Sequence, residues 1–244
     1  MQEMNIQILG SSSKGNGYII NTDSGSLIIE CGMKFKIAEN ALNFDIHNVR
    51  GVLVSHEHGD HAAYLADYAR YFKIYATEGT LRQKGLINAY NTEVIRYMQP
   101  FSIGDFRVIA FKTVHDAEEP CGYLIILPNG EKLAFATDTR VLNVDIKDVS
   151  YWMVECNYER AILVKNVNSG IINTSLANRI ISSHLSLDQL KKMIMLNDMS
   201  KTKLIMLIHL SDKNSNADRF VSEISQLTGK LTICAKKGQI IELL

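Results

Sequence analysis

The chain has few of the residues that cross-link or interrupt a fold. Its 244 residues include only three prolines and four cysteines, and no two cysteines form a C-x-x-C pair. Such widely scattered cysteines argue against a disulfide framework. We therefore expect core thiols of a protein in a reducing compartment, at Cys31, Cys121, Cys156 and Cys234.

The sequence also lacks long apolar runs and an excess of either charge. No run approaches the roughly 20 residues that a membrane-spanning helix needs, and the first residues enter a strand-like run rather than a signal peptide. We therefore expect a cytoplasmic protein with no membrane partner. The 26 basic and 26 acidic residues balance, so nucleic-acid binding would require a local basic patch or bound metal ions.

What the chain does contain is a succession of short apolar runs, and its 46% hydrophobic residues can fill a substantial core. Runs of strand type cover residues 6–9, 18–20, 27–29, 52–54, 73–76, 94–97, 106–113, 123–127, 132–136, 151–155 and 204–208. Helical spacing appears at three places, namely residues 61–72, the segment after a capping box at Ser186, and residues 216–227. The helix after Ser186 should bury Leu187, Leu190, Ile194 and Met195.

Strands followed by helices, twice over, predict an α/β (α+β) fold. The simplest arrangement packs two sheets together with helices outside, a four-layer αββα sandwich. No linker, repeat or low-complexity segment divides the sequence. We therefore expect a single domain over residues 1–244.

The most distinctive segment is His56-Glu57-His58-Gly59-Asp60-His61, which reads H-x-H-x-D-H directly after an apolar strand. It offers four metal-capable side chains within six residues. One divalent ion needs about three or four protein ligands, and further candidates follow downstream. The count therefore favours two ions side by side, an arrangement typical of hydrolysis at phosphorus.

Histidine or aspartate also follows three later strands. These residues are His115 after residues 106–113, Asp138 after residues 132–136, and His209 after residues 204–208. A single such residue is usually a hydrogen-bonded structural group. Repetition at four strand ends favours a shared metal site along one edge of the sheets.

Taken in order, the H-x-H-x-D-H segment, the lone His, the lone Asp and the final His resemble the metallo-β-lactamase superfamily, over nearly the whole chain. Shorter segments resemble its YycJ/WalJ-like subgroup, at residues 10–16, 75–80, 115–123, 136–139, 183–186 and 209–216. The resemblance implies a metal-dependent hydrolase. In the subgroup it implies an exonuclease that acts on DNA, an inference that rests on analogy of fold and motif.

The resemblance also implies a ligand set of seven residues, with His56, His58 and His115 on one ion, Asp60, His61 and His209 on the other, and Asp138 bridging both. Two Zn²⁺ ions are the first expectation for these imidazoles and carboxylates, with Mn²⁺ as the alternative. A hydroxide held between the ions would attack phosphorus in line. Asp60 would also orient that water as a catalytic residue.

Two further residues are implied in supporting roles. Glu30 occupies a position where the family usually has Asp, behind the H-x-H-x-D-H loop, and its extra methylene predicts metal binding with altered geometry. His184 precedes the helix start at Ser186, where backbone N–H groups favour anions. It would bind a substrate phosphate or protonate the leaving oxygen, the alternative being a surface histidine near a helix cap.

Weaker expectations concern substrate contacts beside these motifs, at Ser12, Ser13, Asn16 and Asn214. A Gly- and Ser-rich loop such as residues 10–17 can cradle a phosphate, although most are simple turns. Asn216 is expected to cap the following helix.

The leading interpretation is a dinuclear phosphodiesterase that degrades single-stranded DNA from its 5′ end. The same site could cleave RNA, a small phosphodiester or a thioester. A metal-binding module without turnover is the interpretation from a different class, and the completeness of the ligand set argues against it.

Overall fold

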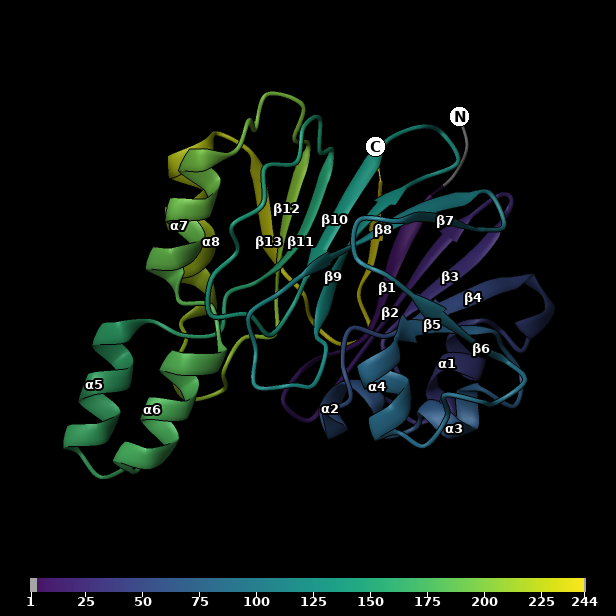
Figure 1. The fold of residues 1–244 in the computed structure, drawn as a ribbon. Coiled ribbons are helices and arrows are strands. Elements are labelled where there is room, and N and C mark those ends of the chain that lie inside the picture. Colours follow the sequence, from purple (N-terminus) through teal and green to yellow (C-terminus); the bar gives the residue numbers. More distant parts are fainter. Residues whose placement is uncertain (1–3, 244) are drawn as a thin grey trace. The chain divides into compact units, whose positions relative to one another are not determined.

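A computed structural model describes residues 4–243 of the chain (Figure 1). The described residues form two compact units. Unit 1 contains the residues up to Lys112, residues 117–131 and the residues from Lys236 onward, and unit 2 contains residues 113–116 and 132–235. The strands of the chain belong to two mixed sheets.

Unit 1 contains a seven-stranded sheet in the order β14-β1-β2-β3-β4-β5-β6. Its strands are β1 (Asn5–Ser12), β2 (Gly15–Thr22), β3 (Gly25–Ile29), β4 (Val49–Leu53), β5 (Ile74–Thr77), β6 (Thr92–Ile95) and β14 (Ile240–Glu242). Pairing is antiparallel from β14 to β3 and parallel from β3 to β6. The same unit holds an antiparallel group of β7 (Pro100–Ile103), β8 (Phe106–Lys112) and β9 (Cys121–Ile126).

Helices cover one face of the large sheet of unit 1, and Figure 1 shows α1, α3 and α4 grouped on one side of it. The helices are α1 (Phe35–Ala41), η1 (Ile46–Asn48), α2 (Gly59–Ala62), α3 (Leu65–Tyr68) and α4 (Glu78–Gln83). Their apolar side chains share a core with alternate strand residues, which includes Ile19, Ile28, Val52, Ala38, Leu65 and Tyr68. Alternation along a strand sends the intervening residues to the opposite face.

The opposite face of this sheet packs against the antiparallel group of unit 1. The rings of Tyr75 and Phe101 stack with their centroids 5.6 Å apart. The Tyr123 hydroxyl donates to the Val54 carbonyl at 2.6 Å, and the Cys121 N–H donates to the Ser55 carbonyl at 3.0 Å. These contacts fix the chain just before the H-x-H-x-D-H segment.

Unit 2 contains the parallel strands β10 (Lys132–Ala136), β11 (Tyr151–Glu155), β12 (Leu204–Ile208) and β13 (Leu231–Cys234). Their near-continuous apolar runs are typical of parallel strands buried on both faces. The helices are α5 (Arg160–Asn168), α6 (Thr174–Ser183), α7 (Leu187–Leu196) and α8 (Ala217–Thr228). In Figure 1, α5 and α6 form one pair and α7 and α8 another.

The sequence interpretation was correct for most strands and for the caps of two helices. Ser186 accepts a hydrogen bond from the Gln189 N–H at the start of α7, and Asn216 does the same with Arg219 at the start of α8. The predicted burial of Met195 was wrong, because that side chain is 73% exposed. Met193 is buried in its place.

Two further details differ from the expectations. The Gly- and Ser-rich segment is a hairpin rather than an open loop, since β1 extends to Ser12 and β2 begins at Gly15. Among the residues that the structure describes, no helix combines the length and the apolar character needed to span a bilayer. All four cysteines are buried.

Candidate metal centre

The H-x-H-x-D-H segment begins just after β4 of unit 1 and turns directly into α2. The ring centroids of His56 and His58 are 4.8 Å apart, and those of His56 and His61 are 4.3 Å apart. His56 and His61 are buried, whereas His58 and Asp60 are half-buried. The segment therefore gathers three imidazoles and a carboxylate at one end of the strand.

The buried carboxylate of Glu30 lies behind this loop. Its Oε1 atom accepts a hydrogen bond from the Ser55 N–H at 3.2 Å, and its Oε2 atom lies 3.5 Å from His61 Nδ1. The Ser55 hydroxyl lies 2.8 Å from His56 Nδ1. Glu30 thus contacts the loop at both of its ends.

Asn16 of β2 contacts the same loop from another direction. Its side-chain amide nitrogen lies 3.1 Å from His61 Nε2, 3.2 Å from the Asp60 carbonyl oxygen and 3.4 Å from Asp60 Oδ2. Asn16 is 1% exposed, which leaves little surface for the substrate contact predicted from the sequence. These contacts give it a supporting position beside the loop.

The same contacts explain why the helix expected after the motif is divided into α2 and α3. In a continuous helix the Tyr64 N–H would donate to the Asp60 carbonyl. Instead, the Asn16 amide faces that carbonyl, and the Tyr64 N–H donates to the Cys31 carbonyl at 3.0 Å. Gly32 approaches so closely that a Cβ atom there would lie 1.8 Å from the Asp60 oxygen.

In unit 2, Asp138 lies between two of the predicted histidine ligands. Its Oδ1 atom is 2.5 Å from His209 Nδ1, and its Oδ2 atom is 3.5 Å from His115 Nε2. The Thr137 hydroxyl donates to Oδ1 at 2.8 Å. One carboxylate therefore reaches both imidazoles.

The orientation of His115 is set by a hydrogen bond. Its Nδ1 atom lies 2.9 Å from the Ser183 carbonyl oxygen, and because a carbonyl can only accept, Nδ1 carries the proton. The lone pair on Nε2 is then available to a metal. Burial lowers the pKa of His115 below its ordinary value, against the opposing charge of Asp138, which favours the neutral imidazole that metal binding requires.

The structure adds a buried acid, Glu155, that the sequence interpretation missed. Its Oε1 atom lies 2.6 Å from His184 Nδ1 and 3.3 Å from His209 Nδ1. Its Oε2 atom accepts hydrogen bonds from the N–H groups of Thr139 and Leu185, at 3.0 Å and 2.9 Å. Glu155 is the last residue of β11, so it stands at a strand end like the proposed ligands, but a pattern of His and Asp alone does not include it.

Glu155 and His184 form a charged pair. Burial alone would raise the pKa of Glu155, but attraction and a hydrogen bond from His184, with a hydrogen bond from His209, hold it below its ordinary value. Burial likewise lowers the pKa of His184, yet the charge and hydrogen bond of Glu155 raise it above its ordinary value.

Donor atoms of Asp138, Glu155, His184 and His209 all lie within 4.8 Å of one another, so this group has the composition of a metal site.

Three residues of these clusters have left-handed backbone conformations, with φ values of 71° at Glu30, 43° at Asp138 and 52° at His209. Positive φ is uncommon in residues other than glycine. Each conformation costs on the order of 1–3 kcal/mol and persists where the surroundings enforce it. The sharp turn at each strand end directs the side chain toward its cluster.

The remaining predicted residues have different surroundings. Ser12 is half-buried at the end of β1, and Ser13 is exposed in the following turn. Asn214 is buried in unit 2, where it accepts a hydrogen bond from Asn166 at 2.9 Å and donates to the Ser211 hydroxyl at 3.2 Å. These contacts account for Asn214 as a structural residue.

The donor groups fit a divalent metal centre. Both units supply imidazole nitrogens and carboxylate oxygens, the groups that Zn²⁺ and Mn²⁺ accept. At His56 and His115 the second ring nitrogen lies within 2.9 Å of a protein oxygen, an arrangement that orients metal-ligating histidines. The His/Asp clusters are therefore consistent with a dinuclear site.

Comparison with known proteins agrees with this chemistry. A family model described as "Beta-lactamase superfamily domain" matches residues 27–210, which include parts of both units. Exodeoxyribonuclease YycJ of Bacillus anthracis is 29% identical over 239 residues, covering 92% of this chain and 89% of the relative. Exodeoxyribonuclease WalJ of Streptococcus pneumoniae serotype 2 is 25% identical over 239 residues, covering 91% and 85%.

A solved structure, the metallo-β-lactamase fold protein YhfI of Bacillus subtilis, superimposes with a TM-score of 0.75 at 17% identity, covering 99% of this chain and 100% of that one. This likeness confirms the predicted fold class of two mixed sheets with helices. The chain is accordingly a metal-dependent hydrolase with the metallo-β-lactamase fold. It belongs to the family described as "Beta-lactamase superfamily domain".

Proposed function

We propose that this hydrolase is a dinuclear phosphodiesterase that degrades single-stranded DNA from the 5′ end. The observation that carries the proposal is that each unit gathers its own part of the motif: His56, His58, Asp60 and His61 lie together after β4 in unit 1, and His115 and His209 lie beside Asp138 in unit 2. Two relatives that align over most of their length are exodeoxyribonucleases by name. We further propose that both units act together as one hydrolase domain over residues 1–244.

The proposed ligands divide between two ions. His56 and His58 of unit 1 would hold one ion with His115 of unit 2, and Asp60 and His61 of unit 1 would hold the other with His209 of unit 2, while Asp138 would bridge them. Zn²⁺ is the first expectation and Mn²⁺ the alternative. When bound, such a pair of ions supplies an activated water and neutralises charge on the phosphoryl oxygens.

The other residues would position these groups or move protons. Glu30 and Asn16 hold the ligand loop through the hydrogen bonds and contacts described above, so their proposed role is to fix the directions of His61 and Asp60. Asp60 would also orient the attacking water. Ser12 and Ser13 remain candidate substrate contacts.

His184 is the proposed general acid. The Glu155 carboxylate, 2.6 Å from Nδ1, stabilises the protonated imidazole, and the raised pKa of His184 increases its protonated fraction near neutral pH. A proton on Nε2 would then be available for the leaving oxygen of the scissile phosphodiester. Binding of a substrate phosphate is a second role that the same charge supports.

The proposal places the enzyme in the cytoplasm, which the four buried thiols and a DNA substrate both favour. RNA and small phosphodiesters share the reacting phosphoryl group with DNA. They are therefore the competing substrates, and the test below compares them directly.

The test is digestion of 5′-phosphorylated, end-labelled single-stranded DNA by the purified protein with Mn²⁺ or Zn²⁺, beside an Asp60→Ala/His61→Ala variant. The proposal predicts stepwise shortening from the 5′ end that is absent in the variant and faster than digestion of RNA of the same sequence. Preferred cleavage of RNA would overturn the DNA assignment. Turnover of only small phosphodiesters or thioesters by the metal-loaded protein would overturn the nuclease assignment.

A further inference from the structure

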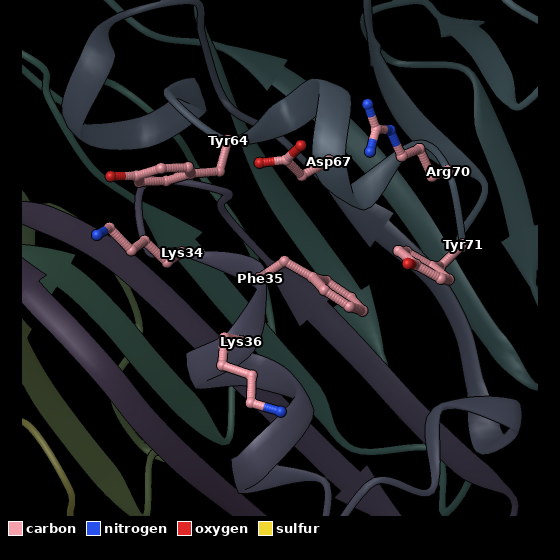
Figure 2. A pocket seen from close by; sticks show the side chains of 7 residues that line it. All are labelled: Lys34, Phe35, Lys36, Tyr64, Asp67, Arg70 and Tyr71. Atoms are coloured by element: carbon pink, nitrogen blue, oxygen red, sulfur yellow. The ribbon is translucent and has the colours of Figure 1, made fainter.

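A pocket on unit 1 combines aromatic rings with positive charge (Figure 2). It encloses about 300 Å³ and is lined by Lys34, Phe35, Lys36, Tyr64, Asp67, Arg70 and Tyr71. In Figure 2, Tyr64 and Lys34 lie toward one end and Arg70 and Tyr71 toward the other, with Phe35 between them. The volume is at the lower end of the range for small-molecule sites, roughly 300–1,000 Å³.

One end of the pocket is joined to the H-x-H-x-D-H loop by backbone hydrogen bonds. The Cys31 N–H donates to the His61 carbonyl at 2.7 Å, and the Tyr64 N–H donates to the Cys31 carbonyl at 3.0 Å. Tyr64 follows His61 by three residues across the break between α2 and α3, and the Cys31 backbone bonds to both residues. A chain lying in the pocket would therefore approach the ligand loop of the same unit.

The aromatic residues offer ring faces for stacking. Phe35 and Tyr71 stack with centroids 4.5 Å apart and planes 4° apart, and Tyr71 is 55% exposed. The rings of Phe35 and Tyr68 pack edge to face, with their centroids 5.4 Å apart, and this contact holds Phe35 in place. Tyr64 packs partly against the core of unit 1 and contacts no other ring within residues 4–243.

The charged residues of the pocket are mostly cationic. Lys34 and Arg70 form no ion pair with any residue that the structure describes, whereas Lys36 pairs with Glu39 at 3.0 Å. Asp67 is the one acidic residue of the lining. Because the whole chain has no net charge, this local excess of cations is the kind of patch that a polyanion requires.

We propose that this pocket is a stacking subsite for single-stranded DNA, an inference that rests on the proposed nuclease function. Bases would stack on Tyr71 and Tyr64, while Lys34 and Arg70 contact the phosphates beside them. Sites for single strands combine aromatic platforms with cations along the backbone, and the stacking is tolerant of sequence. The phosphates of a nucleic acid recur along its backbone, so one strand can contact both Lys34 and Arg70. A protein partner carries no such regular row of anions, and a nucleic acid is therefore favoured.

The test measures binding of a fluorescent single-stranded oligonucleotide to the metal-loaded protein, in parallel with hydrolysis of bis(4-nitrophenyl) phosphate. We expect Tyr71→Ala/Arg70→Ala to weaken oligonucleotide binding about tenfold or more without changing turnover of the small diester. The matched control is Tyr90→Ala/Arg96→Ala, which removes an exposed tyrosine and an exposed arginine elsewhere on unit 1. Asp67→Asn should strengthen binding, because it removes the acid of the lining.

An oligonucleotide with abasic positions separates stacking from phosphate contact. Tyr71→Ala alone should have little effect on the abasic strand, whereas Arg70→Ala should weaken binding of both strands. Equal loss in the pocket and control variants, or wild-type affinity in Tyr71→Ala/Arg70→Ala, would overturn the subsite. Loss of small-diester turnover in that variant would overturn it as well, since the pocket residues would then act on the centre itself.

The two proposals can fail separately. A protein that cleaves DNA but ignores these substitutions retains the nuclease function and loses the subsite. A protein that binds single strands through Tyr71 and Arg70 but cleaves none retains the subsite and loses the nuclease function. A protein that neither binds nor cleaves DNA loses both.

Discussion

The pair formed by the buried Glu155 and the half-buried His184 links the stability of unit 2 to pH. The folded-state pKa of Glu155 is lowered from 4.5, so its contribution is present above about pH 4.5 and is lost as pH falls through the folded value. The folded-state pKa of His184 is raised from 6.5, so its contribution is present below about pH 6.5 and is lost as pH rises through the folded value. Both contributions are complete only between these two limits.

Glu155→Gln should therefore lower the melting temperature of the metal-free protein most between about pH 4.5 and 6.5, and less on either side. Melting followed by circular dichroism across that range checks this. His47→Gln, at an exposed position in unit 1, serves as the control for a histidine outside the pair. A loss independent of pH would show that Glu155 stabilises the fold only through its backbone hydrogen bonds.

Removal of the Glu30 carboxylate should weaken metal binding by about 10–100-fold, the usual effect of losing a group that orients a ligand. Glu30→Ala leaves the Ser55 N–H without its carboxylate acceptor and removes the neighbour of His61 Nδ1. Competition with a chelating dye measures the affinity, and Glu93→Ala at an exposed position is the control. Unchanged affinity and turnover would refute the positioning role.

His184→Ala should reduce kcat by about 10²–10⁴ if the imidazole is the general acid. Metal content should remain near that of the wild type, because the proposed ligand set excludes His184. Steady-state cleavage together with metal analysis separates the two effects. Full turnover would remove His184 from the chemistry, and loss of metal would make it a ligand within the Asp138, Glu155, His184 and His209 group.

At the scale of elements, the sequence predicted those parts that a local pattern determines. Buried parallel strands such as β12 are continuous apolar runs, and the caps at Ser186 and Asn216 follow from local hydrogen bonding. The proposed ligands stand within a few residues of strand ends, so the same runs also drew attention to them.

Long-range contacts determine what the sequence did not predict. The break between α2 and α3 depends on Asn16 and Cys31, which lie far from Tyr64 in the sequence. Helices α5 and α6, which the sequence interpretation did not include, pack on each other around Leu163 and Ala177. The apolar residues of α5 show little helical periodicity, whereas the amphipathic pattern of α6 was present in the sequence and was missed. Likewise, burial of Met193 rather than Met195 depends on where α7 rests in unit 2, which local spacing does not specify.

The close approach of Gly32 to the ligand loop gives a prediction at this scale. Gly32→Ala would place a Cβ atom 1.8 Å from the Asp60 carbonyl oxygen, so the loop must shift and both metal affinity and turnover should fall at least about tenfold. Gly59→Ala is the matched control and lies within the H-x-H-x-D-H loop itself, where an added Cβ atom meets nothing within 4 Å. Equal behaviour of the two variants would show that the loop tolerates displacement.

At the scale of the whole molecule, zero net charge means that local patches must provide the attraction for a polyanion. If Arg70 contacts a phosphate, Arg70→Ala should reduce the slope of log Kd against log salt by about 0.7 for single-stranded DNA. Binding measured from low to high salt gives this slope. Arg96→Ala, another exposed arginine of unit 1, should leave it unchanged, and an equal decrease in both would assign the effect to general charge.

The central claim is that both units supply ligands to two ions that together hydrolyse DNA. The most direct measurement titrates metal-free protein with Mn²⁺ or Zn²⁺ while the cleavage of 5′-end-labelled single-stranded DNA is followed. The account predicts that cleavage rises to a plateau at two equivalents of metal, and that Asp138→Ala, which removes the proposed bridge, abolishes both the plateau and the second binding event. Cleavage without metal, or no cleavage of DNA by protein with two ions bound, would contradict it.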